Sequence, residues 1–245
     1  MIVPTDDPRA VAAVDTIHAG DVDRLRQLLR DHPELTTAAL GGEDAEEDCG
    51  MTRTLLHVVT DWPGHFRNGA AIVRLLVDAG ADVNARFTGS HTETPLHWAA
   101  SSDDVEVLDA LLDAGADIEA RGAVIGGRTP ISDATAFGQW NAARRLLERG
   151  ASTTFWEAAT LGLIDRVAAA FGNDTLPSRD DITAAFWGAC HGDQQHVAEY
   201  LLDHGADPNW IGWDNHTPLD AARRSRATEL AEWLETRGGH SARRG

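Results

Sequence analysis

The chain has 245 residues and a formal net charge of −18, and apolar residues make up 42% of it. That apolar fraction is enough for a continuous core and excludes a disordered chain. The acidic balance argues against binding to nucleic acid or to an anionic membrane surface, and it favours cationic or neutral partners.

The N-terminal residues 1–9 contain two aspartates and two prolines, and they lack the basic region and apolar core of a signal peptide. No window approaches the eighteen apolar residues that a membrane-spanning helix needs. Two cysteines, Cys49 and Cys190, are too few for the disulfide framework of a small secreted protein. We therefore expect a cytoplasmic protein.

The first predicted helical unit lies near residues 9–40, where two apolar segments meet at Gly20. Residues 41–50 form a strongly acidic loop, which we interpret as solvated and not as a metal site. The second unit spans about 52–85 and carries an insertion of five residues within 61–69, between its two helices. This insertion is either a tolerated surface loop or a segment that overhangs the inner face of the protein.

Two phrases recur in the rest of the chain, in a fixed register. The phrase Leu-Leu-x-x-Gly-Ala, with valine as the second residue of its first copy, places its glycine at positions 80, 115, 150 and 205. The phrase Thr-Pro-Leu-His begins at position 94, with weaker copies at 54, 129 and 217. The first three glycines are 35 residues apart, which indicates a repeat, and the longer gap before position 205 predicts a degenerate unit between.

Each phrase has a local physical meaning. Thr94 is a suitable cap for a helix that begins at Pro95, because the first turn does not need the N–H that proline lacks. Two alanines, 99 and 100, allow this inner helix to approach its neighbours closely. The outer helix at 105–112 has an apolar stripe, and Gly115 supplies the left-handed residue that ends it.

The two phrases resemble the ankyrin-repeat family, and the tryptophan-rich segment 209–214 is similar to those of a group of bacterial ankyrin proteins. The resemblance implies an all-α solenoid of seven helix–turn–helix units with short finger loops, forming a single domain over residues 1–245. The predicted units lie near 9–40, 52–85, 92–120, 127–151, 153–175, 183–209 and 215–238, followed by a polar tail at 239–245. The resemblance also implies that His57 and His97 are structural hydrogen-bonding residues.

Candidate site residues follow from where this chain departs from a plain stack. The position before each Ala-Ala pair of an inner helix is usually aliphatic, but here it holds Trp98, Asp133 and Trp187. A carboxylate at a half-buried position is costly unless it is paired, so Asp133 serves either a ligand or catalytic role or a capping or inter-repeat hydrogen bond. We place these three residues at the base of one groove site, with His191 beside them.

Other candidates come from the positions after Ala-Ala, from the insertion and from the last finger. In the degenerate fifth unit, Trp156 is interpreted as standing where His97 stands in the third unit. No Cys-x-x-Cys or His-x-x-x-His spacing predicts a metal site, and no cofactor motif is present. The complete predicted ligand-binding set is Asp61, Trp62, His65, Trp98, Ser101, Asp133, Phe137, Trp156, Trp187, His191 and Trp213.

Two functions fit these residues. In the first, an acidic, tryptophan-rich concave groove binds a protein, a peptide or a cationic ligand. In the second, the same groove is a small-molecule active site of the isomerase, cyclase or hydrolase type, with Asp133 and His191 as its acid–base pair. Convergence of Trp98, Asp133, Trp187 and His191 on one closed cavity would favour the second function, and their spread along an open groove would favour the first.

Overall fold

The computed structural model describes residues 1–42, 50–172 and 176–242. Cys49 and most of the predicted acidic loop lie outside these ranges. None of the helices within them is both long and apolar enough to cross a membrane. The chain divides into two compact units, residues 1–151 (unit 1) and 152–245 (unit 2). The single continuous domain stays a prediction.

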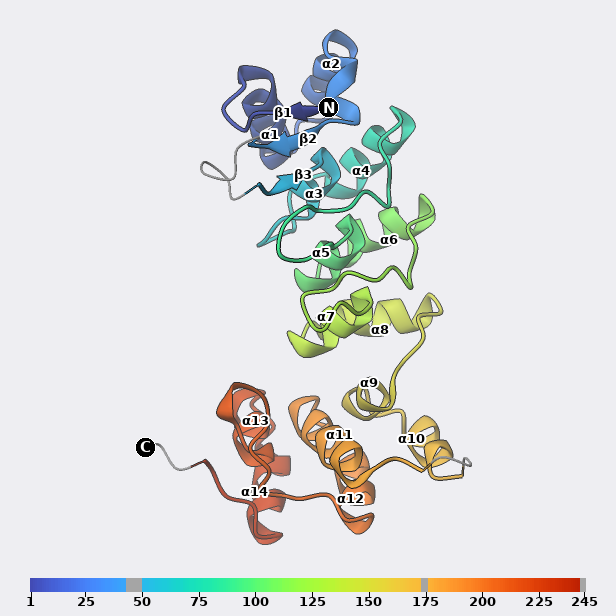
Figure 1. The fold of residues 1–245 in the computed structure, drawn as a ribbon, viewed down its shortest axis with the longest axis vertical. Coiled ribbons are helices and arrows are strands. Elements are labelled where there is room, and N and C mark those ends of the chain that lie inside the picture. The colour runs from blue at the N-terminus through green and yellow to red at the C-terminus, as the bar shows by residue number, and fades with distance from the viewer. Residues whose placement is uncertain (43–49, 173–175, 243–245) are drawn as a thin grey trace. The chain divides into compact units, whose positions relative to one another are not determined.

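The described part of unit 1 contains four helix pairs, each with an inner and an outer helix (Figure 1). Inner helices pack on inner helices, since α3 contacts α1 and α5, and α5 contacts α7; the outer helices α2, α4, α6 and α8 follow the same order. The pairs are α1 (Pro8–Ala19) with α2 (Val22–Asp31), α3 (Leu55–Thr60) with α4 (Gly69–Asp78), α5 (Pro95–Ser101) with α6 (Val105–Asp113), and α7 (Pro130–Ala136) with α8 (Trp140–Glu148).

The recurring phrases form the predicted caps. Thr94 is the N-cap of α5, and its backbone N–H donates to Nδ1 of His97 at 3.1 Å. The other ring nitrogen, Nε2, lies 3.3 Å from the carbonyl oxygen of Arg128 in the next repeat. His57 makes the same pair of bonds to Thr54 and to the carbonyl of Glu93. Both histidines are therefore confirmed as structural hydrogen-bonding residues that join one repeat to the next.

The outer helix α6 ends as its glycine predicts. Gly115 has a φ of 92°, a left-handed conformation that a residue without a side chain adopts easily. Its N–H donates to the carbonyl of Leu112, and the N–H of Ala116 donates to that of Leu111, which closes the helix end. The apolar stripe of α6 is buried, with Leu108 and Leu111 both fully inaccessible to solvent.

A small three-stranded sheet at the N-terminal end was not expected from an all-α solenoid with short finger loops. Strand β2 (Ala39–Gly41) pairs antiparallel with β3 (Thr52–Arg53), and β1 (Ile2–Val3) pairs parallel with β2. The N-terminal strand β1 covers the edge of β2 that β3 leaves free. Val3 is buried there with 2% of its surface exposed. A 3₁₀ turn, η1 (Pro33–Thr36), links α2 to this sheet.

Unit 2 contains three further pairs among its described residues. They are α9 (Phe155–Thr160) with α10 (Ile164–Ala170), α11 (Arg179–His191) with α12 (Gln195–Asp203), and α13 (Pro218–Arg224) with α14 (Thr228–Thr236), and a 3₁₀ turn η2 (Trp213–Asn215) precedes α13. The interpretation of Trp156 as the counterpart of His97 is wrong. Thr154 caps α9 together with Glu157, so Glu157 occupies the position of His97, and Trp156 lies one residue earlier.

Candidate functional site

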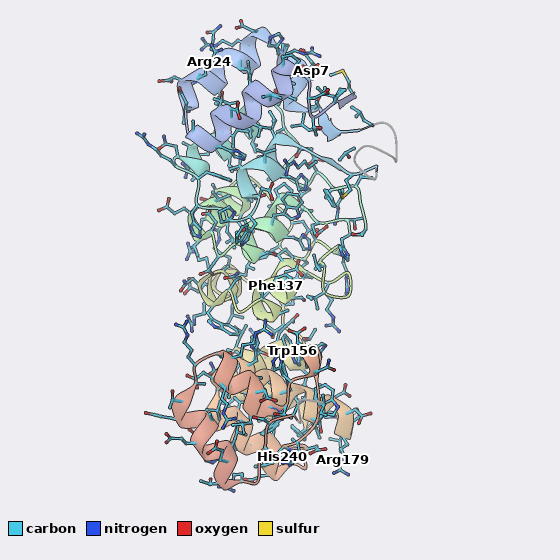
Figure 2. All side chains as sticks on the ribbon, turned by 90° about the vertical axis from the view of Figure 1, so that its left-hand side faces the viewer. Asp7, Arg24, Phe137, Trp156, Arg179 and His240 are labelled. Carbon is cyan, nitrogen blue, oxygen red and sulfur yellow. The ribbon has the colours of Figure 1, made fainter. Side chains whose placement is uncertain are left out.

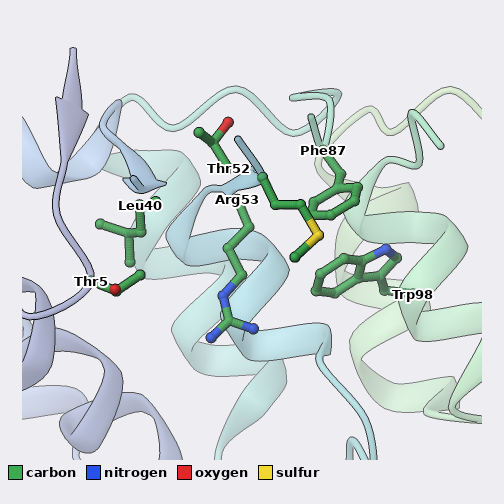
Figure 3. A pocket seen from close by; sticks show the side chains of 8 residues that line it. Thr5, Leu40, Thr52, Arg53, Phe87 and Trp98 are labelled. Atoms are coloured by element: carbon green, nitrogen blue, oxygen red, sulfur yellow. The ribbon is translucent and has the colours of Figure 1, made fainter. Parts of the chain in front are cut away.

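A cavity of about 270 Å³ opens in unit 1 between the small sheet, the finger that precedes α5 and the helix α5 itself (Figure 3). A finger here is the segment that joins the outer helix of one pair to the inner helix of the next. Apolar and aromatic groups predominate on its wall, with one guanidinium. The lining residues are Thr5, Leu40, Gly41, Met51, Thr52, Arg53, Phe87 and Trp98.

Trp98 forms one side of this cavity. It is half-buried on α5, and its ring meets the ring of Phe87 with centroids 5.4 Å apart. Its other neighbour is His57, whose imidazole lies edge-on at 5.0 Å. Burial lowers the pKa of His57 to about 4, so this imidazole is neutral at pH 7. The aromatic wall of the cavity is therefore uncharged.

Arg53 supplies the charge in the cavity, and Asp61 balances it. The two side chains form an ion pair, and each is about one-third exposed, at 33%. Asp61 ends α3, so the pair joins the start of that helix to the beginning of the insertion. Of the predicted ligand-binding residues, Asp61 thus contacts the cavity through Arg53 and not as one of its lining residues.

The insertion within 61–69 is bonded to the repeats on both sides of it. The backbone N–H of His65 donates to Oδ2 of Asp104 at 2.6 Å, and its ring nitrogen Nε2 lies 3.0 Å from the carbonyl of Ser102. On the other side, Nδ2 of Asn68 donates to the carbonyl of Gly20 at 2.9 Å. Trp62 makes none of these bonds and is 80% exposed. The insertion therefore presents an indole to solvent on an anchored backbone.

Asp133 lies fully buried on α7, with 0% of its surface exposed. Oδ1 accepts the backbone N–H of Ile125 at 3.2 Å, from the finger that precedes α7, whereas Oδ2 is buried and has no hydrogen-bond partner among the described residues. Burial raises the pKa of Asp133 to about 6; the backbone N–H groups of Ile125 and Val124 act in the opposite direction, and the charge of nearby Glu93 adds to the rise. The finger bond accounts for one oxygen of Asp133 and leaves the other unpaired.

The remaining two candidates of unit 1 lie at the C-terminal ends of inner helices. The hydroxyl of Ser101 donates to the carbonyl of His97 at 2.9 Å, and the carbonyl of Ser101 accepts a bond from Gln139 at the same distance. Ser101 thus bonds within α5 through its hydroxyl, and through its carbonyl it bonds to Gln139, the N-cap of α8. Phe137 follows α7 and is 47% exposed (Figure 2).

In unit 2 the candidates form a cluster of tryptophans around Trp213. Its ring meets three others edge-on, with centroid distances of 4.9 Å to Trp187, 5.7 Å to Trp156 and 5.4 Å to Trp210. Trp187 is buried on α11, and its indole N–H donates to the carbonyl of His216 at 2.9 Å. Trp213 itself is 48% exposed, and Trp156 lies on α9 (Figure 2).

His191 lies beside this cluster, with its ring 5.5 Å from that of Trp187. Its carbonyl accepts the hydroxyl of Ser225 at 2.6 Å, so it joins α11 to the end of α13. The adjacent Cys190 is fully buried, and burial raises the pKa of its thiol. Within the part of the chain that the structure describes, no group of three His, Cys, Asp or Glu side chains is placed to hold a metal ion.

Some of the predicted residues are therefore brought together within each unit, whereas Ser101, Asp133 and Phe137 do not line the cavity of unit 1. Trp98, with the Arg53–Asp61 pair, belongs to the cavity of unit 1, and Trp156, Trp187, Trp213 and His191 belong to the cluster of unit 2. The convergence of Trp98 and Asp133 with Trp187 and His191 on one site stays a prediction.

Sequence reasoning missed Arg53, Glu93, Phe87 and Met51. Arg53 and Glu93 had a usable signal, because each immediately precedes a helix-capping threonine of the repeat phrase. Phe87 and Met51 had none, because they lie in irregular segments whose path the repeat pattern does not determine.

Models of known families match most of the chain. The model described as ankyrin repeats (3 copies) matches residues 16–122 and 68–155, and the model described as ankyrin repeat matches residues 181–212. No curated protein matches the chain. The matched segments cover more than half of the 245 residues, and the helix pairs and their caps have the form that the repeat phrases predicted. The chain thus belongs to the ankyrin-repeat family, and its all-α repeat-solenoid fold is confirmed.

Proposed function

We propose that this protein is a binding module that holds a protein partner by inserting one of the partner's apolar side chains into the cavity beside Trp98. Ankyrin repeats generally bind other proteins, through their fingers and inner helices. The cavity includes both of these elements beside the small sheet, since Phe87 belongs to a finger and Trp98 to the inner helix α5.

The size of the cavity favours a side chain over a free small molecule. Its volume of about 270 Å³ is below the roughly 300–1,000 Å³ of pockets that enclose drug-sized ligands. A single large apolar side chain needs less room than such a ligand. Aromatic residues that wall a small pocket are also the usual anchors of protein interfaces.

Trp62 supports the same proposal. It is 80% exposed, and it follows Asp61, which is paired with the cavity residue Arg53. An indole that is held outside the core on an anchored loop provides a second apolar contact next to the cavity. The net charge of −18 favours a partner that is cationic or neutral around this contact.

The catalytic alternative has less support. It needs Asp133 to exchange a proton with a substrate in the cavity, but Asp133 is not among the residues that line the cavity. His191, the other half of the predicted acid–base pair, lies beside Trp187 in unit 2 and does not line the cavity. We therefore propose binding and not catalysis.

The proposal is tested by selecting peptides from a random display library against the full chain and measuring their affinity for variants. Met51→Glu places a charge at the cavity without touching the buried core, because Met51 is 42% exposed. We expect this variant and Trp98→Ala to weaken the selected peptides about tenfold or more, as loss of an interface anchor does.

Trp233→Ala is the matched control, since it removes an indole from the outer helix α14 in unit 2. It should leave the affinity unchanged. Circular dichroism establishes that Trp98→Ala remains folded. Selected peptides that bind Met51→Glu and Trp98→Ala as tightly as the wild type would refute the proposed site.

A further inference from the structure

The register of the repeats places Glu93 and Asp133 together. The threonines that cap α3, α5 and α7 are Thr54, Thr94 and Thr129. Arg53 immediately precedes the first of them, and Trp98 is the fourth residue after the second; these two side chains line the same cavity. Glu93 and Asp133 are in the same two positions one repeat further along. They therefore belong to the corresponding place between α5 and α7.

Both carboxylates in this place are buried and incompletely bonded. Glu93 is 5% exposed and Asp133 is 0% exposed. Oε2 of Glu93 and Oδ2 of Asp133 are each buried without a hydrogen-bond partner among the described residues. A buried carboxylate oxygen without a donor is costly, and two neighbouring ones are more so because their charges repel. The arrangement lacks a positively charged donor.

No part of the chain that the structure describes supplies that donor. The ion pairs of its arginines involve other carboxylates, such as Asp61 with Arg53 and Asp109 with Arg145. The charge of Glu93 is close enough to Asp133 to help raise the pKa of Asp133, after burial as the main cause. The charge of His91, on the finger before α5, acts in the opposite direction. The corresponding place one repeat earlier contains the guanidinium of Arg53.

We propose that Glu93 and Asp133 together receive one positively charged group of the binding partner, the guanidinium of an arginine or the ammonium of a lysine. This inference rests on the proposed function and adds the chemical class of a second contact. A guanidinium donates several N–H bonds in a fixed plane and an ammonium donates three, so either satisfies both unpaired oxygens. The net charge of −18 attracts such a group from solution.

The spacing defines the partner more closely. Neighbouring inner helices pack about 8–10 Å apart, and an extended chain advances about 3.3 Å per residue. A basic residue about three positions from the apolar anchor therefore reaches Glu93 and Asp133 while the anchor occupies the cavity. Entry of the charge requires a shift of the backbone at Ile125, because its N–H bonds to Oδ1 of Asp133.

The amide resonance of Ile125 is the direct reporter of this site. Three probes are titrated into the full chain at pH 7: the N-acetyl amides of arginine, of lysine and of citrulline, which is the neutral counterpart of arginine. We expect arginine or lysine to shift the Ile125 resonance saturably and citrulline to leave it in place. Glu93→Gln and the double variant Glu93→Gln/Asp133→Asn should weaken the response about tenfold or more, as loss of a charge-assisted bond does.

Glu106→Gln is the matched control, because it removes an equal charge from the first turn of α6. It should respond like the wild type. The inference is overturned if citrulline produces the same shift, if the double variant responds like the wild type, or if the resonance responds to pH but to neither cation. Peptides that depend on Trp98 but not on Glu93 would retain the proposed function and refute this second contact.

Discussion

The ring of Trp98 lies edge-on against the imidazole of His57, with their centroids 5.0 Å apart. This contact joins the hydrogen-bond framework of the repeats to the cavity, because His57 bonds to Thr54 within its own repeat and to the carbonyl of Glu93 in the next. The cavity wall is therefore as rigid as the framework behind it. A rigid apolar pocket loses little entropy when a partner binds, which suits the proposed anchor.

His57 and His97 should remain neutral well below pH 6.5. Burial lowers the pKa of each to about 4. Because the unfolded chain binds these protons near pH 6.5, the folded state loses stability as the pH falls from about 6.5 to about 4, by up to roughly 3 kcal/mol per histidine. Imidazole resonances followed by NMR measure both values. Midpoints near 6.5 would contradict the burial and bonding described for these rings.

Asp133 should have the opposite dependence on pH. Its pKa is raised to about 6 in the folded protein, from 3.8 as an unperturbed group, so it destabilises the fold as the pH rises from about 4 to about 6. Asp133→Asn should therefore raise the free energy of unfolding at pH 7 by about 1–3 kcal/mol, and the gain should disappear near pH 4. Denaturant titrations at the two pH values measure this. A loss of about 3 kcal/mol or more would indicate a structural ion pair instead.

Gly188→Ala should destabilise unit 2, although alanine is the better helix former. A Cβ at position 188 on α11 would lie 2.5 Å from Oγ1 of Thr160 and 2.8 Å from Nε1 of Trp156. We expect this overpacking to cost about 1–3 kcal/mol, more than the roughly 1 kcal/mol that alanine contributes through helix propensity. Gly172→Ala is the control, because its Cβ would meet only the carbonyl of Ala169, at 3.5 Å. A stabilised Gly188→Ala variant would contradict the packing of α9 on α11.

Helix α10 should be less protected than α6. Among their residues, α10 buries Val167 alone, whereas α6 buries Val107, Leu108, Ala110 and Leu111. A repeat with few buried side chains depends on its neighbours and opens more easily. Hydrogen exchange followed by mass spectrometry compares the two helices in the same sample. Equal protection would show that the degenerate fifth unit is as stable as the third.

Much of the fold could be predicted because the residues that start and end its helices recur at fixed positions in the repeats. Thr94 and Pro95 start a helix and Gly115 ends one whatever surrounds them, so helices and turns follow from the sequence. The site was less predictable. Trp98 was found because it replaces an expected aliphatic residue, whereas Phe87 and Met51 reach the same cavity from irregular segments that no periodicity describes.

Asp133 shows a second limit of prediction from the sequence. Its position in the repeat predicted a costly carboxylate, but not that Ile125 would bond to one oxygen and leave the other unpaired. Trp156 shows a third, because without the cap of Thr154 and Glu157 the degenerate fifth unit could be aligned with its neighbours in more than one way. At Asp133 the pairing between a finger and a helix determines the structure, whereas at Trp156 the local cap of α9 does.

The eight indole N–H resonances of the protein test the binding proposal most directly, because tryptophans are present in both units. A peptide selected against the full chain is titrated into labelled protein while these resonances are followed. The account predicts that the indoles of Trp98 and Trp62 shift and broaden saturably, whereas those of Trp140 and Trp233 on outer helices remain in place. A saturable response confined to the cluster around Trp213, with Trp98 and Trp62 unchanged, would contradict it.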